Sequence, residues 1–341
     1  MAPRSASDNG DPRVAVVGAS TAVGMRLREH LAEYRVPGSR VDLYGTSTGE
    51  AVISEYAGEA RLVQEPEPDE IGRHDVIFLC EPSDLSRSLT RSASPHAIVI
   101  DLVNAISEPP RPPRVHMDVN PEVTREHQGV LAVAHPVAIL LADLLGPLEA
   151  EVGLSEAVAV VLRPAADFGQ AGVEELREQT VRLLSFVEVP AETFGRQLAF
   201  NVIPQTRLAC DPPGMESRIE GDVAELLDWD RPRLTLRLLA VPVFYGHSLQ
   251  LRLRFKDEVT VERIKELLGK RSPAPVPSDE SRATPLDVSG ESDTNLYQIS
   301  DDGLGGFWLL AVAGETDGRG AEQAVRIADS LCGLRAGVER P

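Results

Sequence analysis

The chain has 341 residues, 42% of them hydrophobic, and a formal net charge of −19. This length allows two domains with a sizeable core, and the hydrophobic content excludes an intrinsically disordered chain. The acidic balance argues against nucleic acids or anionic membranes as partners. The three cysteines, Cys80, Cys210 and Cys332, are too widely spaced to suggest a disulfide framework or a zinc site. Because the polar amino terminus has no apolar signal core and no apolar run is long enough to span a membrane, we expect a cytoplasmic protein.

The first part of the chain alternates short apolar runs with turns and helical patterns. Residues 13–18 predict a strand and residues 19–34 a helix. Further strands are predicted at 40–46, 74–80, 96–102 and 129–135. Short apolar strands separated in this way are typical of a doubly wound parallel sheet. We therefore predict an α/β, Rossmann-like domain of the NAD(P)-binding type over residues 12–136, completed by a carboxy-terminal helix at 319–335.

Residues 137–318 have a different pattern, which predicts an α+β domain with a mixed or antiparallel sheet. A strand ending in "LRPAAD" is followed by a helix at 172–186, and a second helix is predicted at 260–270. The segments 233–244 and 247–256 alternate like half-buried antiparallel strands, and 306–314 is another strand. The Pro- and Ser-rich stretch 271–293 is interpreted as a surface loop.

A glycine-rich turn, "GASTAVG", lies between the first strand and the first helix. Gly18 permits a tight turn, Gly24 permits close packing of helix on strand, and the helix amino terminus could receive a phosphate. The candidate phosphate-binding residues are Gly18, Ser20, Thr21, Val23 and Gly24. Thr21 stands where a middle glycine would let the backbone approach a pyrophosphate. An ordinary turn with Ser20 or Thr21 as helix cap remains the alternative.

The junction after the last strand of this domain is unusual. In "GVLAVAHPVAILLADLLGPL", residues 129–148, a strand breaks at His135 and Pro136 before an apolar helix begins. Such junctions lie at the carboxyl edge of a sheet, where α/β enzymes often carry a nucleophile. Residues 134–138 contain neither Cys nor Ser.

Several separated strings resemble the aspartate-semialdehyde dehydrogenase family, from about Arg13 to Leu334. They are "VAVVGASTAVG", "VNP", "VEELREQT", "AFNVIPQ", "VPVFYGHS", "TPLDVSG" and "GAEQAVRIAD". The resemblance implies an NADP-dependent enzyme of amino-acid biosynthesis that reductively dephosphorylates aspartyl phosphate. It also implies a cysteine thiolate that forms a thioester, a histidine acid/base, a glutamine beside the cysteine, and basic residues that hold the substrate. A thiolate suits this chemistry because it is both a good nucleophile and a good leaving group.

Carried over residue by residue, the resemblance places Pro136 at the position of the nucleophilic cysteine. No cysteine lies between Cys80 and Cys210, so a shift in alignment does not restore one. Arg163 falls at the glutamine, and His247 in "GHS" falls at the acid/base histidine. Ser107 and Ala240 fall at the two substrate-binding arginines and carry no positive charge. Arg218 is a loose match to the substrate-binding lysine.

After the second strand, Ser47, Thr48 and Glu50 stand where the resemblance implies a basic contact to the NADP 2′-phosphate, and a glutamate there would repel it. Cofactor binding is therefore expected to be weak or absent.

These replacements favour a catalytically silent member that keeps the family's fold and forms a homodimer, with an unidentified protein as a further partner. One alternative is an active NAD(P)-dependent oxidoreductase with altered chemistry, using Cys80, His135, His247 or Arg163. Another is a nucleotide-sensing module based on the turn at Gly18–Gly24. His247 could instead keep only a strand-end hydrogen bond, and Cys80 could be a buried apolar residue.

Overall fold

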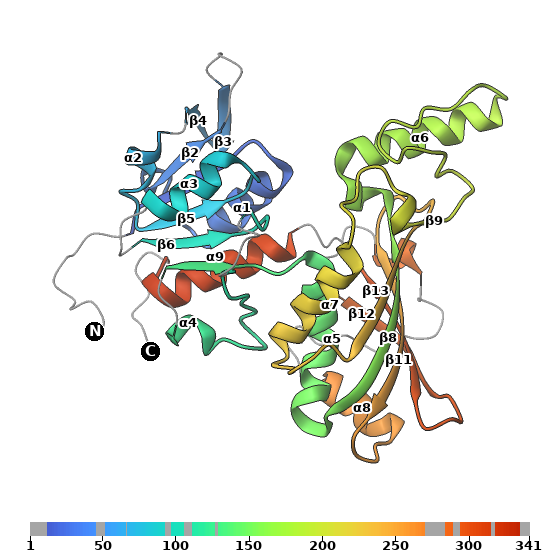
Figure 1. Ribbon diagram of the computed structural model, residues 1–341. Coiled ribbons are helices and arrows are strands. Elements are labelled where there is room, and N and C mark those ends of the chain that lie inside the picture. The colour runs from blue at the N-terminus through green and yellow to red at the C-terminus, as the bar shows by residue number, and fades with distance from the viewer. Residues whose placement is uncertain are drawn as a thin grey trace. The chain divides into compact units, whose positions relative to one another are not determined.

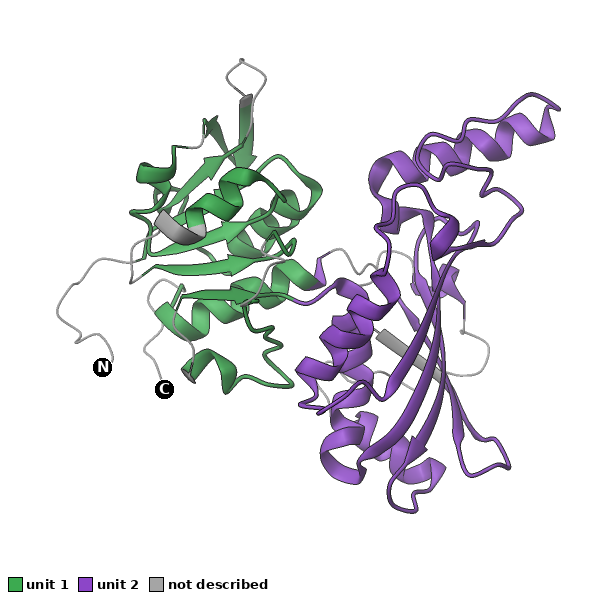
Figure 2. Ribbon diagram, in the orientation of Figure 1, with its two compact units in different colours: residues 1–133, 320–341 green, residues 134–319 purple. Residues whose placement is uncertain are grey.

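The computed structural model describes residues 12–45, 52–65, 67–92, 97–105, 111–126, 129–269, 284–288, 294–314 and 318–334. The chain forms two compact units (Figures 1 and 2). Unit 1 comprises residues 1–133 and 320–341, and unit 2 comprises residues 134–319. The predicted combination of a Rossmann-like unit with an α+β unit is confirmed.

Unit 1 is built on a seven-stranded sheet in the order β3-β4-β2-β1-β5-β6-β7. Its strands are β1 (Val14–Val17), β2 (Val41–Tyr44), β3 (Val52–Tyr56), β4 (Glu59–Gln64), β5 (Val76–Leu79), β6 (Ile98–Asp101) and β7 (Val130–Ala132). All neighbouring strands are parallel except β3 and β4, which form an antiparallel hairpin that the sequence pattern did not predict. The unit's helices are α1 (Ala22–Glu33), α2 (Pro68–Ile71), α3 (Asp84–Ser92), α4 (Val123–Glu126) and α9 (Arg319–Cys332).

The strand order reverses between β1 and β5, because β2 lies on one side of β1 whereas β6 follows β5 on the other. Such a switch point leaves a crevice beyond the carboxyl ends of the two strands. The four residues of β1 are fully buried, as are those of β5, so packing on both faces holds the two strand ends firmly.

Unit 2 contains a six-stranded sheet in the order β12-β13-β11-β8-β10-β9. Its strands are β8 (Leu154–Arg163), β9 (Ile203–Pro204), β10 (Leu234–Ala240), β11 (His247–Phe255), β12 (Thr294–Asp301) and β13 (Phe307–Ala313). The helices are α5 (Pro136–Val152), α6 (Gly169–Leu184), α7 (Met215–Leu226) and α8 (Val261–Gly269). β10 runs parallel to β8 and antiparallel to β9, while β8 and β11 are antiparallel, so the prediction of a mixed or antiparallel sheet is confirmed and the sheet is mixed.

The two faces of this sheet differ in burial. Ala157, Ala159 and Val161 of β8 are fully buried, in line with helices α5, α7 and α8 beside the sheet in Figure 1. The alternating positions Val158 and Val160 on the other face are only half-buried. The β8 period of two therefore separates a core face from a face that this unit covers incompletely.

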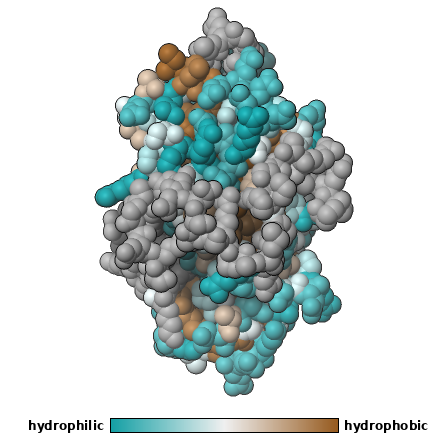
Figure 3. All heavy atoms as spheres, turned by 90° about the vertical axis from the view of Figure 1, so that its left-hand side faces the viewer, coloured by the Kyte–Doolittle hydropathy of each residue, from teal (hydrophilic) through white to brown (hydrophobic). Residues whose placement is uncertain are grey.

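The surface drawn in Figure 3 is hydrophilic over most of its described residues, with hydrophobic side chains gathered in small groups. None of the helices in the described ranges is both long and apolar enough to cross a membrane.

Candidate functional site

The junction singled out in the sequence is occupied by a helix cap. His135 is the N-cap of α5, and its Nδ1 accepts a hydrogen bond from the backbone N–H of Val137 at 3.2 Å. Pro136 is the first helical residue, where its missing N–H and fixed φ are well tolerated. The backbone N–H of His135 donates to Asp222 of α7 at 3.3 Å. The position assigned to the nucleophile therefore starts a helix and offers no reactive atom.

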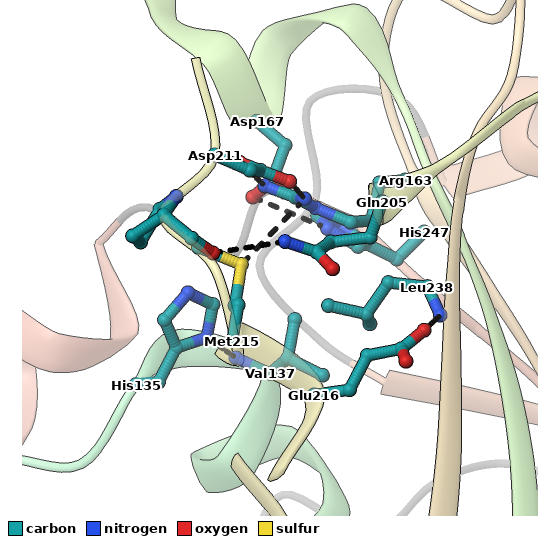
Figure 4. A network of polar contacts seen from close by, with 11 residues as sticks. His135, Val137, Arg163, Asp167, Gln205, Asp211, Met215, Glu216, Leu238 and His247 are labelled. Atoms are coloured by element: carbon teal, nitrogen blue, oxygen red, sulfur yellow. Dashed lines mark hydrogen bonds and ion pairs between the residues drawn. The ribbon is translucent and has the colours of Figure 1, made fainter. Parts of the chain in front are cut away.

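Arg163, the last residue of β8, lies in a buried ion network with two carboxylates (Figure 4). Its Nε donates to Asp167 and its Nη1 to Asp211, and Nη2 lies 3.4 Å from the second oxygen of Asp211. The guanidinium carbon also lies 4.5 Å from the centroid of the Phe168 ring. Every polar edge of the guanidinium is thus directed at groups of the chain itself.

Three of the predicted site positions meet at one end of the unit 2 sheet. Arg163 is paired with Ala240 across the parallel β8–β10 ladder, and His247 begins β11 on the other side of β8. His247 Nε2 lies 3.4 Å from Oδ1 of Asp167, and both groups are almost fully buried. Ala240 is buried and provides no functional group where the resemblance implied an arginine.

The charges of the network shift several pKa values. Burial alone would raise the pKa of Asp167, but Arg163 and His247 outweigh it and hold that pKa well below its usual range. Burial tends to lower the pKa of Arg163, but Asp167 and Asp211 outweigh it and raise that pKa. Burial, together with the nearby cations, lowers the pKa of His135 to about 4. The ion network is therefore charged at neutral pH, whereas His135 is neutral.

The segment between β9 and α7 contributes further contacts near the ion network. Gln205 is buried, and its side-chain amide donates to the carbonyl of Pro212 at 2.9 Å. The sulfur of Met215 lies 3.8 Å from Arg163 Nη1. Arg218, the loosely aligned substrate position, is exposed on α7, and its charge contributes to the low pKa of His135.

Cys210 is an exposed cysteine next to Asp211 in this segment. Burial of its sulfur and the charge of Asp211 raise the pKa of the thiol. At neutral pH the thiol form is favoured, so Cys210 lacks the environment of an activated nucleophile.

The glycine-rich turn of unit 1 has the predicted backbone. Gly18 has φ +84, and a Cβ on Gly24 would lie 2.2 Å from the carbonyl oxygen of Gly18. Thr21 is the N-cap of α1, since its Oγ1 accepts the N–H of Gly24 at 3.0 Å. The same hydroxyl lies 3.0 Å from the carbonyl oxygen of Cys80 at the end of β5. One helix-terminal N–H that a phosphate could use is thus already bonded.

Three other candidates in the turn and on β5 contribute little chemistry of their own. Ser20 is exposed, and Val23 is partly buried in the first turn of α1. Cys80 is 1% exposed, and burial raises the pKa of its thiol, which disfavours the thiolate. Ser107, Ser47, Thr48 and Glu50 lie outside the described residues.

The two carboxylates that neutralise Arg163 were not among the predicted site residues. Asp167 follows Arg163 by four positions, so a buried arginine at the end of a strand could have pointed to it. Asp211 is 48 residues away in the sequence and reaches Arg163 only through the fold. No local pattern in "ACDPPG" distinguishes that aspartate from a turn residue.

Comparison with known proteins places these features in context. Residues 13–127 match a family model described as the semialdehyde dehydrogenase NAD binding domain. Residues 145–304 match a model described as the semialdehyde dehydrogenase dimerisation domain. The chain is 26% identical over 335 residues to aspartate-semialdehyde dehydrogenase from Bacillus subtilis, covering 93% of this chain and 96% of the relative.

A second relative is described without an activity. A USG-1 protein homolog from Pseudomonas aeruginosa is 28% identical over 261 residues, which cover 75% of this chain and 77% of the relative. Among solved structures, a probable aspartate-semialdehyde dehydrogenase from Pseudomonas aeruginosa superposes with a TM-score of 0.82 at 25% identity. That superposition covers 94% of this chain and 98% of the solved one.

Proposed function

Because this chain belongs to the aspartate-semialdehyde dehydrogenase family, we propose that it is a catalytically silent member that acts as a homodimeric scaffold. The observation that carries the proposal is the junction at residues 134–138. There Pro136 begins helix α5 at the position of the nucleophile, and no thiol is present. Acyl transfer through a thioester needs a sulfur nucleophile beside its base, and neither His135 nor Pro136 can replace it.

The ion network around Arg163 supports the same conclusion. A guanidinium bound by two buried carboxylates is neutralised within the chain, so it has no charge left to attract an anionic substrate. His247 faces Asp167 in this network at 3.4 Å. The residues at the strand ends therefore stabilise one another where an enzyme of this family would hold its substrate.

An assay for reductive dephosphorylation and its reverse tests the proposal. Purified protein is incubated with aspartate semialdehyde, phosphate and NADP, and no turnover above the background without enzyme is expected. Pro136→Cys is expected to remain inactive, because Arg163 and Ala240 still occupy the glutamine and arginine positions.

Cys210→Ser and Cys80→Ser distinguish silence from altered chemistry. Turnover by the unaltered chain that either serine variant abolishes would support an active enzyme with a relocated nucleophile. Turnover that survives both variants would equally contradict a silent protein. As a control, the exposed Cys210 is alkylated in the folded chain before the assay. Turnover that persists after this treatment does not depend on that thiol.

Unit 1 is proposed to bind nucleotides only weakly. The matching family model is an NAD binding domain, and the turn keeps its glycine geometry. We expect weak binding without preference for NADP over NAD, because Thr21 already bonds the N–H of Gly24 and crowds the approach of a pyrophosphate. Calorimetric titration with NADPH and NADH measures this, and a tight, NADP-selective isotherm would favour a nucleotide-sensing module instead.

The homodimer is proposed to form through the less covered face of the unit 2 sheet. This face carries half-buried Val158, Val160 and Leu162, and Trp308, which is 41% exposed. A shallow hollow of about 380 Å³ lies on it, lined by Gln250, Gln298, Ser300 and Trp308. An apolar centre within a polar surround is what a stable interface requires.

Light scattering coupled to size exclusion tests this interface. The expected mass is twice the 36.9 kDa of one chain. Trp308→Glu is expected to shift the protein toward monomer, whereas Leu62→Glu, which alters an exposed apolar residue of unit 1, should not. A single 36.9 kDa species at all concentrations would contradict the dimer.

A further inference from the structure

In unit 1 the turn after β1 and the segment Cys80–Pro82 after β5 lie against each other at the carboxyl ends of the two strands, where a switch point in a parallel sheet leaves a crevice. The hydroxyl of Thr21 lies 2.8 Å from the carbonyl oxygen of Gly18 in its own turn and 3.0 Å from that of Cys80, and its single hydrogen is shared between these two acceptors. Glu81 lies directly against Gly18, since a Cβ built on that glycine would meet Cβ of Glu81 at 2.9 Å and its Cγ at 3.0 Å.

The position of Glu81 is held by the backbone around it. The N–H of Cys80 donates to Val17 of β1 at 2.8 Å. The hydroxyl of Ser86 donates to the carbonyl of Glu81 at 2.7 Å. Pro82 follows, which restricts the backbone of the preceding residue to extended conformations. The side chain of Glu81 therefore starts from a fixed point over the glycine turn.

The carboxylate of Glu81 is poorly matched to its surroundings. Its Oε1 is buried and accepts no hydrogen bond from any described residue. A buried acceptor without a donor lowers stability, so packing alone does not account for a glutamate at this position. Its negative charge lies against the turn that would receive the two phosphates of a dinucleotide.

We infer that Glu81 is the specificity-determining residue that excludes dinucleotides from the crevice. This rests on the proposed weak nucleotide binding and names its main cause. Two effects act together. The side chain occupies the space above Gly18 that close approach of a pyrophosphate requires, and its charge repels the phosphates. The glycine backbone itself remains suited to the ligand, so removing the Glu81 side chain should restore nucleotide binding.

Binding of NADH, NADPH and ADP-ribose to three variants tests the inference. Glu81→Gln removes the charge and keeps the size, Glu81→Ala removes both, and Thr21→Gly removes the other bridging side chain. We expect both Glu81 variants to bind all three nucleotides at least about tenfold more tightly than the unaltered chain, with the larger gain for Glu81→Ala. Glu122→Gln, which removes one exposed charge from the same unit, is the matched control and should change nothing.

The outcomes separate this inference from the proposed function. Tight binding by the unaltered chain would overturn both. Weak binding by the unaltered chain and by both Glu81 variants would overturn the inference alone, and tightening only in Thr21→Gly would assign the exclusion to Thr21. Thermal melting of each variant verifies folding, and Glu81→Gln should melt no lower than the parent because it removes an unmatched buried charge.

Discussion

The phosphate turn of unit 1 and the strand-end site of unit 2 depart from their family's chemistry in different ways. The turn keeps the backbone that a dinucleotide needs, with Gly18 at φ +84 and Gly24 in close contact, and the side chains of Thr21 and Glu81 lie against it. The strand-end site is made by side chains, and there Arg163, Asp167 and Asp211 form a buried ion network. A site made by backbone geometry can keep that geometry beneath neighbouring side chains, whereas a site made by side chains depends on which residues stand there.

The ion network offers the largest test of this comparison. Arg163→Met leaves Asp167 and Asp211 buried without their cation, and breaking such a network costs about 3–5 kcal/mol in the free energy of unfolding. Urea unfolding at pH 7 measures the loss. Arg177→Met, which removes the partner of Glu174 from an exposed pair at 2.9 Å, should cost less than about 1 kcal/mol. Equal losses in the two variants would mean that the network contributes no special stability.

The backbone of the turn is tested by adding one methyl group. Gly24→Ala places a Cβ 2.2 Å from the carbonyl oxygen of Gly18, and overpacking of this kind costs about 1–3 kcal/mol. Gly221→Ala in α7 is the control, because nothing lies within 4 Å of its added Cβ, and a helical alanine should stabilise by about 0.5–1 kcal/mol. If Gly24→Ala also stabilised the protein, that result would contradict the close packing of Gly24 against Gly18 at the turn.

The sequence predicted the central strands of both units and missed short or edge elements in each, including the β3–β4 hairpin of unit 1, for physical reasons. Residues 13–18 and the helix after them are local patterns whose burial and period follow from neighbouring residues. Helix α7 and the short strand β9 were not predicted, and the pairing of β10 with β8 could not be read from alternation. Period two reports which face is buried but not the direction of the neighbouring strand.

The candidate site shows the same limit at the level of single residues. The missing thiol could be read from residues 134–138 alone, since no alignment shift supplies one. The ion network around Arg163 could not be read in this way, because Asp211 reaches Arg163 across 48 residues through tertiary contacts. The absence of a residue type can be read from a short stretch of sequence, but a contact between residues far apart in the sequence depends on the fold.

His135 gives the strand-end region a pH dependence. Its pKa of about 4 in the folded state lies below the ordinary 6.5, so the unfolded chain binds more protons between these values. The free energy of unfolding should therefore fall as the pH is lowered from 6.5 to 4, by about 1–2 kcal/mol for a partly exposed group. The lowered pKa of Asp167 adds a further loss only at lower pH, once carboxylates of the unfolded chain become protonated.

His135→Asn separates the two contributions in urea titrations at pH 7, 5.5 and 4.5. Asparagine is a good N-cap, so the helix start is preserved while the titrating group is removed. The slope between pH 6.5 and 4.5 should flatten in this variant. A slope unchanged from that of the parent would assign the pH dependence to other groups.

The smallest expected effect concerns the hydroxyl of Thr21, which lies between the turn after β1 and the segment after β5. Thr21→Val keeps the shape of the side chain but removes the cap on Gly24 and the bond to Cys80, at a cost of about 1 kcal/mol. Thr21→Ser keeps the hydroxyl and should stay within about 0.5 kcal/mol of the parent. Thermal melts of both variants measure the difference. If valine were tolerated as well as serine, the turn would be held by its glycines and strand packing alone. Its backbone would then not depend on the Thr21 hydroxyl, in contrast to the strand-end site, which depends on its side chains.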